Sequence, residues 1–168
     1  MIILLFFISL IIMLSTVGYG YFFVKISGLK YPTNNLGLIG LLGLFLLSII
    51  ASYSHILTPH SYLFNVSLII LGILFIVYEF LKKNFQISSF TNLVLIFVAL
   101  FITIILSKNN EDFPYYHLPN AIQFAQQKLE FGIGNLNHGF KHISSIFMLM
   151  SLNYLPIIKH YLFNLSNF

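Results

Sequence analysis

Long apolar stretches separated by short polar interruptions make up the first two thirds of the chain. Each stretch is long enough, or nearly long enough, to cross the ~30 Å of hydrocarbon in a bilayer as a helix. The four stretches cover residues 2–24, 36–55, 62–81 and 92–107. Pro59 lies in the second interruption, where a proline ends a helix. The pattern predicts an all-α protein, a polytopic bundle of transmembrane helices.

The second apolar stretch is rich in glycine, with Gly37, Gly40 and Gly43 at regular intervals. Small residues allow two membrane helices to approach closely. We therefore expect this segment to pack tightly against a neighbouring helix.

The last third of the chain has a different pattern. Residues 108–142 are polar, and residues 143–168 are apolar again but interrupted by Asn153, Pro156 and Lys159. The final stretch is either a fifth spanning helix or a helix that breaks near Pro156, since proline disrupts a helix interior. The predicted organisation is a four-span region over 1–107, a polar loop over 108–142 and a fifth segment over 143–168, giving four to five spans.

Within the polar region, apolar residues recur at helical spacing, which predicts a short amphipathic helix lying in the membrane interface. These residues are Ala121, Ile122, Ala125 and Leu129. Pro119 suits the first turn of this helix, and Gly132 suits its C-terminal cap.

Composition agrees with a membrane protein and excludes several other classes. Of the 168 residues, 58% are hydrophobic and 7% charged, whereas soluble domains are about one quarter charged. All eight basic residues are lysines, scattered along the chain, so the net charge of +4 does not indicate nucleic-acid binding. Cysteine is absent, which excludes disulfides and thiolate metal sites. The first stretch has no basic residue before it and no small-residue cleavage signal, so we interpret it as a retained anchor.

The lysines also predict an orientation. Lys25 and Lys30 lie in the first interruption and Lys82 and Lys83 in the third, while the second has none. The positive-inside rule places the lysine-bearing loops in the cytoplasm. The loop that contains residues 111–112 is then extracytoplasmic.

The first candidate for chemistry is the acidic pair Glu111 and Asp112, followed by Tyr115, Tyr116 and His117. A carboxylate at the membrane edge with His and Tyr nearby has the groups for general-base catalysis or for binding a divalent cation. The alternative is that these charges mark the point where a helix enters water.

The second candidate is the turn that contains Asn135, His138 and Lys141, whose side chains are donors for a sugar or a phosphate. The alternative is a polar interfacial turn. His55 and His60 flank the second interruption, and we interpret them as interfacial. His117 and His138 lack the spacing of a zinc motif.

Several of these residues resemble the pattern of a known protein family. The shared residues are Asp112, Tyr116-His117-Leu118, Gly132-Ile133-Gly134-Asn135-Leu136 and Ser144-Ser145. The chain resembles a family of bacterial polytopic membrane proteins that is similar to the GT-C class of integral-membrane glycosyltransferases. Members of that family are longer, so the chain looks like an N-terminal portion.

The resemblance implies a protein of the bacterial inner (cytoplasmic) membrane that transfers a sugar from a polyprenyl-phosphate donor to an envelope glycan acceptor outside the cytoplasm. Asp112, with Glu111 beside it, would act as the base or orient a divalent cation; no other cofactor is implied. Substrate would be bound by Tyr116, His117, Asn135, His138 and Lys141. The chain departs from the pattern where four spans precede the acidic loop and where Lys141 lies in a turn that usually holds arginine.

Two other function classes fit the residues. A small transporter or channel component needs polar residues within the spans, and the first four contain almost none apart from hydroxyls, Asn65 and the peripheral Glu79, so this class fits less well. A non-catalytic membrane scaffold, or a fragment, is the third reading. Membrane lipid is the expected partner in each case, and the sequence does not determine an oligomeric state.

Overall fold

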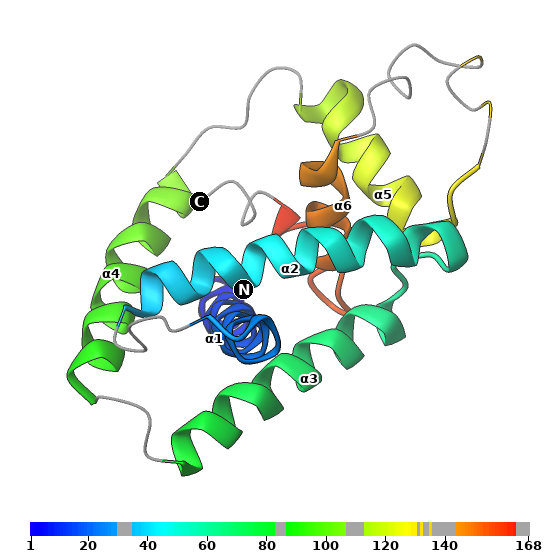
Figure 1. Cartoon of the computed structure of the whole chain (residues 1–168). Coiled ribbons are helices and arrows are strands. Elements are labelled where there is room, and N and C mark those ends of the chain that lie inside the picture. The colour runs from blue at the N-terminus through cyan, green and yellow to red at the C-terminus, as the bar shows by residue number, and fades with distance from the viewer. Residues whose placement is uncertain are drawn as a thin grey trace. The chain divides into compact units, whose positions relative to one another are not determined.

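A computed structural model describes residues 1–29, 35–82, 87–106, 113–130, 132, 135 and 144–163. Its elements are helices, and the described residues form no strand beyond one isolated bridge (Figure 1). The elements are α1 (Ile2–Ser27), α2 (Leu36–Leu57), α3 (Tyr62–Leu81), α4 (Ile87–Leu106), the π-helix η1 (Phe113–His117), α5 (Leu118–Gln126) and α6 (Ser145–Leu152). The all-α prediction is confirmed.

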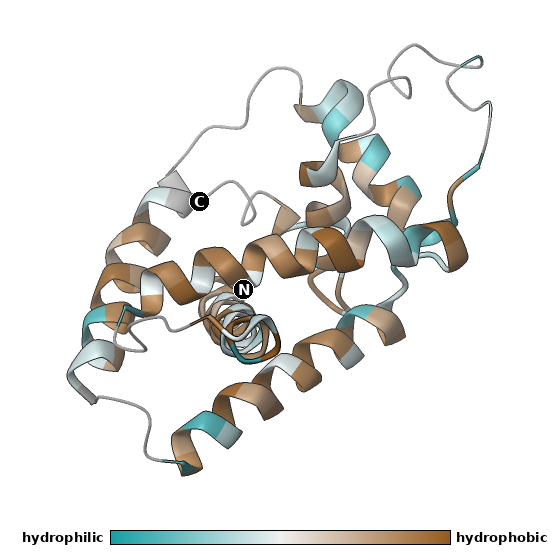
Figure 2. Cartoon of the chain, in the orientation of Figure 1, coloured by the Kyte–Doolittle hydropathy of each residue, from teal (hydrophilic) through white to brown (hydrophobic). Residues whose placement is uncertain are grey.

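The first three helices are long and apolar enough to cross a membrane, and α4 contains a shorter apolar stretch, Ser88–Thr103. Figure 2 shows the hydrophobic character of these helices along their length. Large apolar side chains such as Leu63, Leu74 and Phe45 are more than half exposed. Such a surface is stable against lipid rather than water. The protein is therefore a helical membrane protein.

Helix α4 begins at Ile87, earlier than the predicted start at Asn92. The hydroxyl residues Ser88, Ser89 and Thr91 concealed this first turn in the hydropathy pattern, although a helix accommodates them without difficulty.

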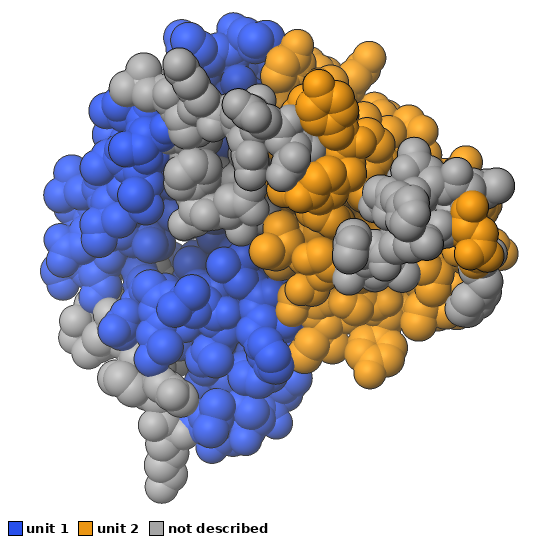
Figure 3. Space-filling view, turned by 90° about the horizontal axis from the view of Figure 1, so that it is seen from above, with its two compact units in different colours: residues 1–47, 67–105 blue, residues 48–66, 106–168 orange. Residues whose placement is uncertain are grey.

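The chain forms two compact units, coloured separately in Figure 3. Unit 1 consists of Met1–Leu47 and Ser67–Ile105, and unit 2 of Ser48–Val66 and Leu106–Phe168. Helices α2 and α3 therefore each contribute residues to both units.

Unit 1 is held together by glycines at helix crossings. A side chain at Gly18 of α1 would overlap the backbone of Gly72 in α3, and one at Gly43 of α2 would overlap the backbone of Thr16 in α1. The prediction that α2 packs closely through glycine thus holds for Gly43. The close approach does not require glycine at Gly37 or Gly40, where an added Cβ meets nothing closer than 3.5 and 3.7 Å, respectively.

The core of unit 1 surrounds these crossings. Its buried members come from α1, α2 and α3, and they are Val17, Tyr21, Leu36, Ile39 and Ile76. The Tyr19 hydroxyl donates to the carbonyl of Leu68 at 2.9 Å, so this buried tyrosine has its polar group satisfied.

Unit 2 contains the short helices. Helix α5 packs against α6 and η1, with Asn120, Ala121, Phe124 and Ala125 on its buried face. The short amphipathic helix is confirmed, with proline in its first turn as expected, and its place in the membrane interface stays a prediction. Its predicted cap was wrong: α5 is capped by Gln127, and Gly132 has a φ of +86° in the segment beyond the helix. The backbone leaves the helix early because the N–H of Leu129 donates to the carbonyl of His55.

The interval predicted to hold a fifth span contains α6, whose first turn is capped by the Ser144 side chain. Eight residues rise only ~12 Å, so α6 alone does not cross a bilayer. The helix ends at Leu152, with Asn153 as its C-cap, and the chain then turns tightly, with Leu155 bridged to Lys159 and Ile157 at a φ of +71°.

Candidate functional site

The predicted site residues fall into two groups. Tyr116 and His117 lie on η1, and Asn135 is an exposed residue whose N–H donates to the carbonyl of Gly132 at 2.9 Å. The others lie outside the described residues: Glu111, Asp112, His138 and Lys141.

Aromatic contacts hold the η1 residues against α6. The ring of His117 lies 4.9 Å from that of Phe147 and 4.3 Å from that of Tyr116, measured between centroids. Both residues are half-buried, and Phe113, the residue after Asp112, is buried. π-Helices are rare and frequently occur at functional sites. Because Phe113 is buried, the segment after the acidic pair is packed within unit 2 from its first residue.

The backbone of η1 is also tied to α5. The Asn120 side-chain amide donates to the carbonyl of Tyr116 at 2.6 Å, and Asn120 is 2% exposed. This bond satisfies a carbonyl at the junction of the two helices, where the helical repeat changes.

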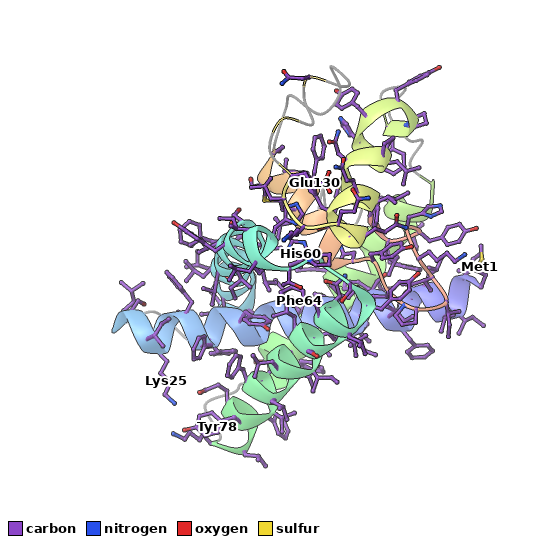
Figure 4. All side chains as sticks on the ribbon, turned by 90° about the vertical axis from the view of Figure 1, so that its right-hand side faces the viewer. Met1, Lys25, His60, Phe64, Tyr78 and Glu130 are labelled. Carbon is purple, nitrogen blue, oxygen red and sulfur yellow. The ribbon has the colours of Figure 1, made fainter. Side chains whose placement is uncertain are left out.

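A second polar group, which the sequence interpretation missed, is centred on His60 in the turn between α2 and α3. The imidazole Nδ1 lies 2.6 Å from the Ser151 Oγ of α6, and Nε2 lies 3.0 Å from the Ser54 Oγ of α2. The ring also stacks on Phe64 at 5.3 Å (Figure 4). His60 and His55 are 0% and 1% exposed, so their interpretation as interfacial residues was wrong.

The direction of these hydrogen bonds follows from the number of hydrogens. The Ser151 hydroxyl donates its one hydrogen to the carbonyl of Met148 at 2.7 Å, so it accepts from His60 Nδ1–H. In neutral His60 the Nε2 atom is then the acceptor, and it shares the one hydrogen of the Ser54 hydroxyl, 3.0 Å away, with the carbonyl of Ala51 at 3.3 Å. The neutral imidazole therefore has a hydrogen-bonding neighbour on both sides.

Asn65 of α3 links the same elements. Its side-chain amide Nδ2 lies 2.8 Å from the carbonyl of His60 and 2.9 Å from the carbonyls of Ser151 and Tyr154. One buried amide therefore holds the α2–α3 turn, the end of α6 and the residue that follows α6. Asn65 therefore has a structural role. It is the polar residue that the transporter hypothesis would require within a span.

Burial, and next the neighbouring His55, lower the pKa of His60 to about 4. The two imidazole centroids are 5.2 Å apart. A positive charge in this environment is unfavourable because it would lose its hydration. His60 is consequently neutral at physiological pH.

Main-chain bonds extend the network to α5. The N–H of His60 donates to the carbonyl of Phe124 at 3.0 Å, and the Leu129 N–H donates to the carbonyl of His55 at 3.0 Å. The Phe124 ring lies 4.5 Å from that of His55. The α2–α3 turn is thus the base on which α5, and through it η1, is fixed.

Tyr62 and Tyr154 form a further contact in unit 2. Their rings stack with centroids 4.6 Å apart. Hydrogen bonds from Tyr62 and Gln126 lower the pKa of the Tyr154 hydroxyl. The pair joins the start of α3 to the turn after α6.

The network could have been suspected from one signal. Ser54, His55, His60 and Asn65 are four polar residues within or beside two otherwise apolar stretches, and polar residues there usually pair with each other. Their partner Ser151 is more than eighty positions away in the chain, and no local pattern indicates that contact.

No group of three His, Cys, Asp or Glu side chains that could hold a metal ion occurs in the part of the chain that the structure describes. Asp112, at which the divalent cation was predicted, lies outside that part.

Comparison of the chain with protein-family models, with curated proteins and with solved structures finds no match.

Proposed function

We propose that this chain carries the acidic loop of an integral-membrane glycosyltransferase of the GT-C type. The reaction moves a sugar from a polyprenyl-phosphate donor to a glycan acceptor of the bacterial envelope, outside the cytoplasm. The supporting observation is the anchoring of η1. Tyr116 and His117, which follow the acidic pair, are packed on Phe147 of α6 rather than free in solvent.

The proposed chemistry uses the Asp112 carboxylate as a general base. It removes the proton of an acceptor hydroxyl, whose oxygen attacks the anomeric carbon of the donor sugar. The bond from that carbon to the phosphate oxygen breaks, and polyprenyl phosphate leaves with the electron pair. A divalent cation held by Asp112 is the alternative role for the same group, with Glu111 beside it.

Positioned donors are needed because the leaving group carries negative charge. Tyr116 and His117 are proposed to donate hydrogen bonds to the phosphate or the sugar. Asn135, His138 and Lys141 are proposed to bind other polar parts of the substrate. An ammonium such as that of Lys141 acts as a point charge, without the two-pronged geometry of arginine.

The buried hydrogen-bond network of unit 2 supports this proposal. A catalytic group must be held to within a fraction of an ångström, and η1 rests on a network in which His60 and Asn65 are completely buried. We propose that this network positions the acidic loop and does not itself contact substrate.

The experiment measures sugar transfer in membrane vesicles supplied with a panel of radiolabelled polyprenyl-phosphate sugars. Asp112→Asn is expected to lower the rate by about a hundredfold or more, since the amide accepts no proton. His117→Ala is expected to lower it by about tenfold, the value of one lost hydrogen bond to a charged group. Lys128→Gln, which changes an exposed charge in unit 2, is the control and should retain full activity.

Expression and membrane insertion are checked for each variant by quantitative immunoblotting. Full transfer activity in Asp112→Asn at equal protein level contradicts the role of the carboxylate. Absence of transfer from every donor by the unmodified protein contradicts the proposed function.

A further inference from the structure

Two lysines converge on one tyrosine in unit 1. Lys25 lies in the last turn of α1, Tyr78 in the last turn of α3, and Lys82 directly after α3. The Nζ atoms of Lys25 and Lys82 lie 4.6 and 4.5 Å from the centroid of the Tyr78 ring. The Lys25 ammonium also donates to the Tyr78 hydroxyl at 3.3 Å. Figure 4 shows Lys25 and Tyr78 approaching each other from the two helices.

The charges at this place are not balanced. Two ammonium groups share one ring, and cation–π attraction offsets only part of their repulsion. Glu79, one residue from Tyr78, adds a single negative charge that acts on Lys82. The hydrogen bond with Tyr78 raises the pKa of Lys82, so this lysine stays charged at all physiological pH values. The three charged residues carry a net positive charge.

We propose that Lys25, Tyr78 and Lys82 form a binding site for the phosphate group of an anionic phospholipid. Two ammonium groups and a hydroxyl provide donors to several oxygens of one tetrahedral anion. Both lysines are exposed, and Tyr78 is 42% exposed, so the donors are accessible.

The apolar surroundings select a lipid over free phosphate. Ile26, Val77, Phe80 and Leu81 flank the cluster in sequence, and each is at least 45% exposed. An amphiphile satisfies both surfaces, because its phosphate meets the lysines while its acyl chains cover the apolar side chains. Tyrosine and lysine at the end of a spanning helix are the residues found at head-group level.

The predicted membrane orientation agrees with a binding site for an anionic phospholipid. The positive-inside rule places this end of α1 and α3 on the cytoplasmic side, where anionic lipids attract basic residues beside a span. The proposal does not depend on the enzymatic one, because the cluster belongs to unit 1 and shares no residue with the acidic loop.

The test is native mass spectrometry of the full chain released from detergent, titrated with palmitoyl-oleoyl phosphatidylglycerol or phosphatidylcholine. The unmodified protein is expected to bind phosphatidylglycerol more tightly. Lys25→Gln and Lys82→Gln should each weaken this binding about fivefold, and the double variant about twenty-fivefold. Tyr78→Phe, which keeps the ring, should weaken it about threefold through loss of the hydroxyl.

Lys128→Gln is the control for charge and should leave phosphatidylglycerol binding unchanged. Circular dichroism melting shows whether a variant is folded; if the double variant is not, the single variants decide. Competition with inorganic phosphate separates the two sources of the anion: retention of lipid in 10 mM phosphate supports the lipid site. Equal binding of the two lipids, an unchanged double variant, or displacement by phosphate overturns the proposal.

Discussion

In the polar interior of unit 2, single residues such as Asn65 and His60 each link several segments of the chain. Asn65 is completely buried, and its side-chain Nδ2, which carries two hydrogens, lies within 2.9 Å of carbonyls in three separate segments. His60 joins two serines from different helices through both ring nitrogens. Buried polar groups of this kind are costly when a partner is removed, because the remaining groups lose water without gaining a hydrogen bond.

Asn65→Ala is therefore expected to lower the free energy of unfolding by about 3 kcal/mol, since several carbonyls lose their donor. Thermal unfolding in detergent, followed by circular dichroism, measures the change. The matched control is Asn92→Ala at an exposed position of α4, which should stay within about 0.5 kcal/mol of the unmodified protein. Equal melting of the two variants contradicts the role of Asn65.

The buried imidazole of His60 leads to a prediction about how the stability of the protein depends on pH. Its pKa is about 4 in the folded protein, below the usual histidine value of 6.5, so the unfolded chain takes up a proton more readily. The stability that neutral His60 contributes is fully present above pH 6.5 and is lost as the pH falls toward 4. The loss approaches roughly 3 kcal/mol.

Melting temperatures measured between pH 7.5 and 4 check this expectation. His60→Gln keeps hydrogen-bonding capacity without titrating, so its melting temperature should fall less over this interval. Lys128→Gln serves as a variant that leaves the titration intact. Parallel pH profiles of His60→Gln and the unmodified protein would be evidence against the titration of His60 as the cause of the loss of stability.

At the scale of elements, the helices pack through glycines whose positions decide how close they come. Gly18 and Gly72 face each other across α1 and α3, and Gly43 faces Thr16 across α2 and α1. Close approach of this kind increases van der Waals contact between helices in a membrane, where no hydrophobic effect drives their association.

Gly18→Ala is expected to destabilise the protein by about 2 kcal/mol, because the new methyl group meets the backbone of Gly72, which cannot rotate away. Gly40→Ala is the matched control. Its Cβ would lie 3.7 Å from Val17 Cγ2, an ordinary contact, so the higher helix propensity of alanine should leave stability equal or raised by up to about 1 kcal/mol. Thermal unfolding of both variants in one detergent compares them; a more stable Gly18→Ala would contradict the proposed crossing.

The short helices of unit 2 were predictable only in part. The spacing of Ala121 and Ala125 predicted α5 correctly, because amphipathicity is a local property of the sequence. The end of α5 was not predictable, since it depends on the hydrogen bond from Leu129 to the carbonyl of His55. The same reason applies to the buried histidines, whose partners come from distant parts of the chain.

For the whole molecule, the lysine distribution predicts a topology that both proposals use. The chain has no cysteine, so single-cysteine variants allow labelling at one chosen position. In intact spheroplasts, a membrane-impermeant maleimide should label Asn110→Cys and should leave Ser27→Cys unlabelled until the cells are lysed. Both should be labelled equally after lysis, which serves as the control; labelling restricted to Ser27→Cys would reverse the orientation and remove the basis of the enzymatic proposal.

The sequence by itself determined the class of this protein. Long apolar stretches have to be helices in lipid, because every backbone polar group there needs an internal partner. The same local rules predicted the first turn of α5 and named Asp112, Tyr116 and His117 as candidates for chemistry. Only the tertiary structure decided which glycines form crossings, that His55 and His60 are buried, and that Tyr78 gathers two lysines. These features are contacts between residues far apart in the chain, and hydropathy and spacing describe only near neighbours.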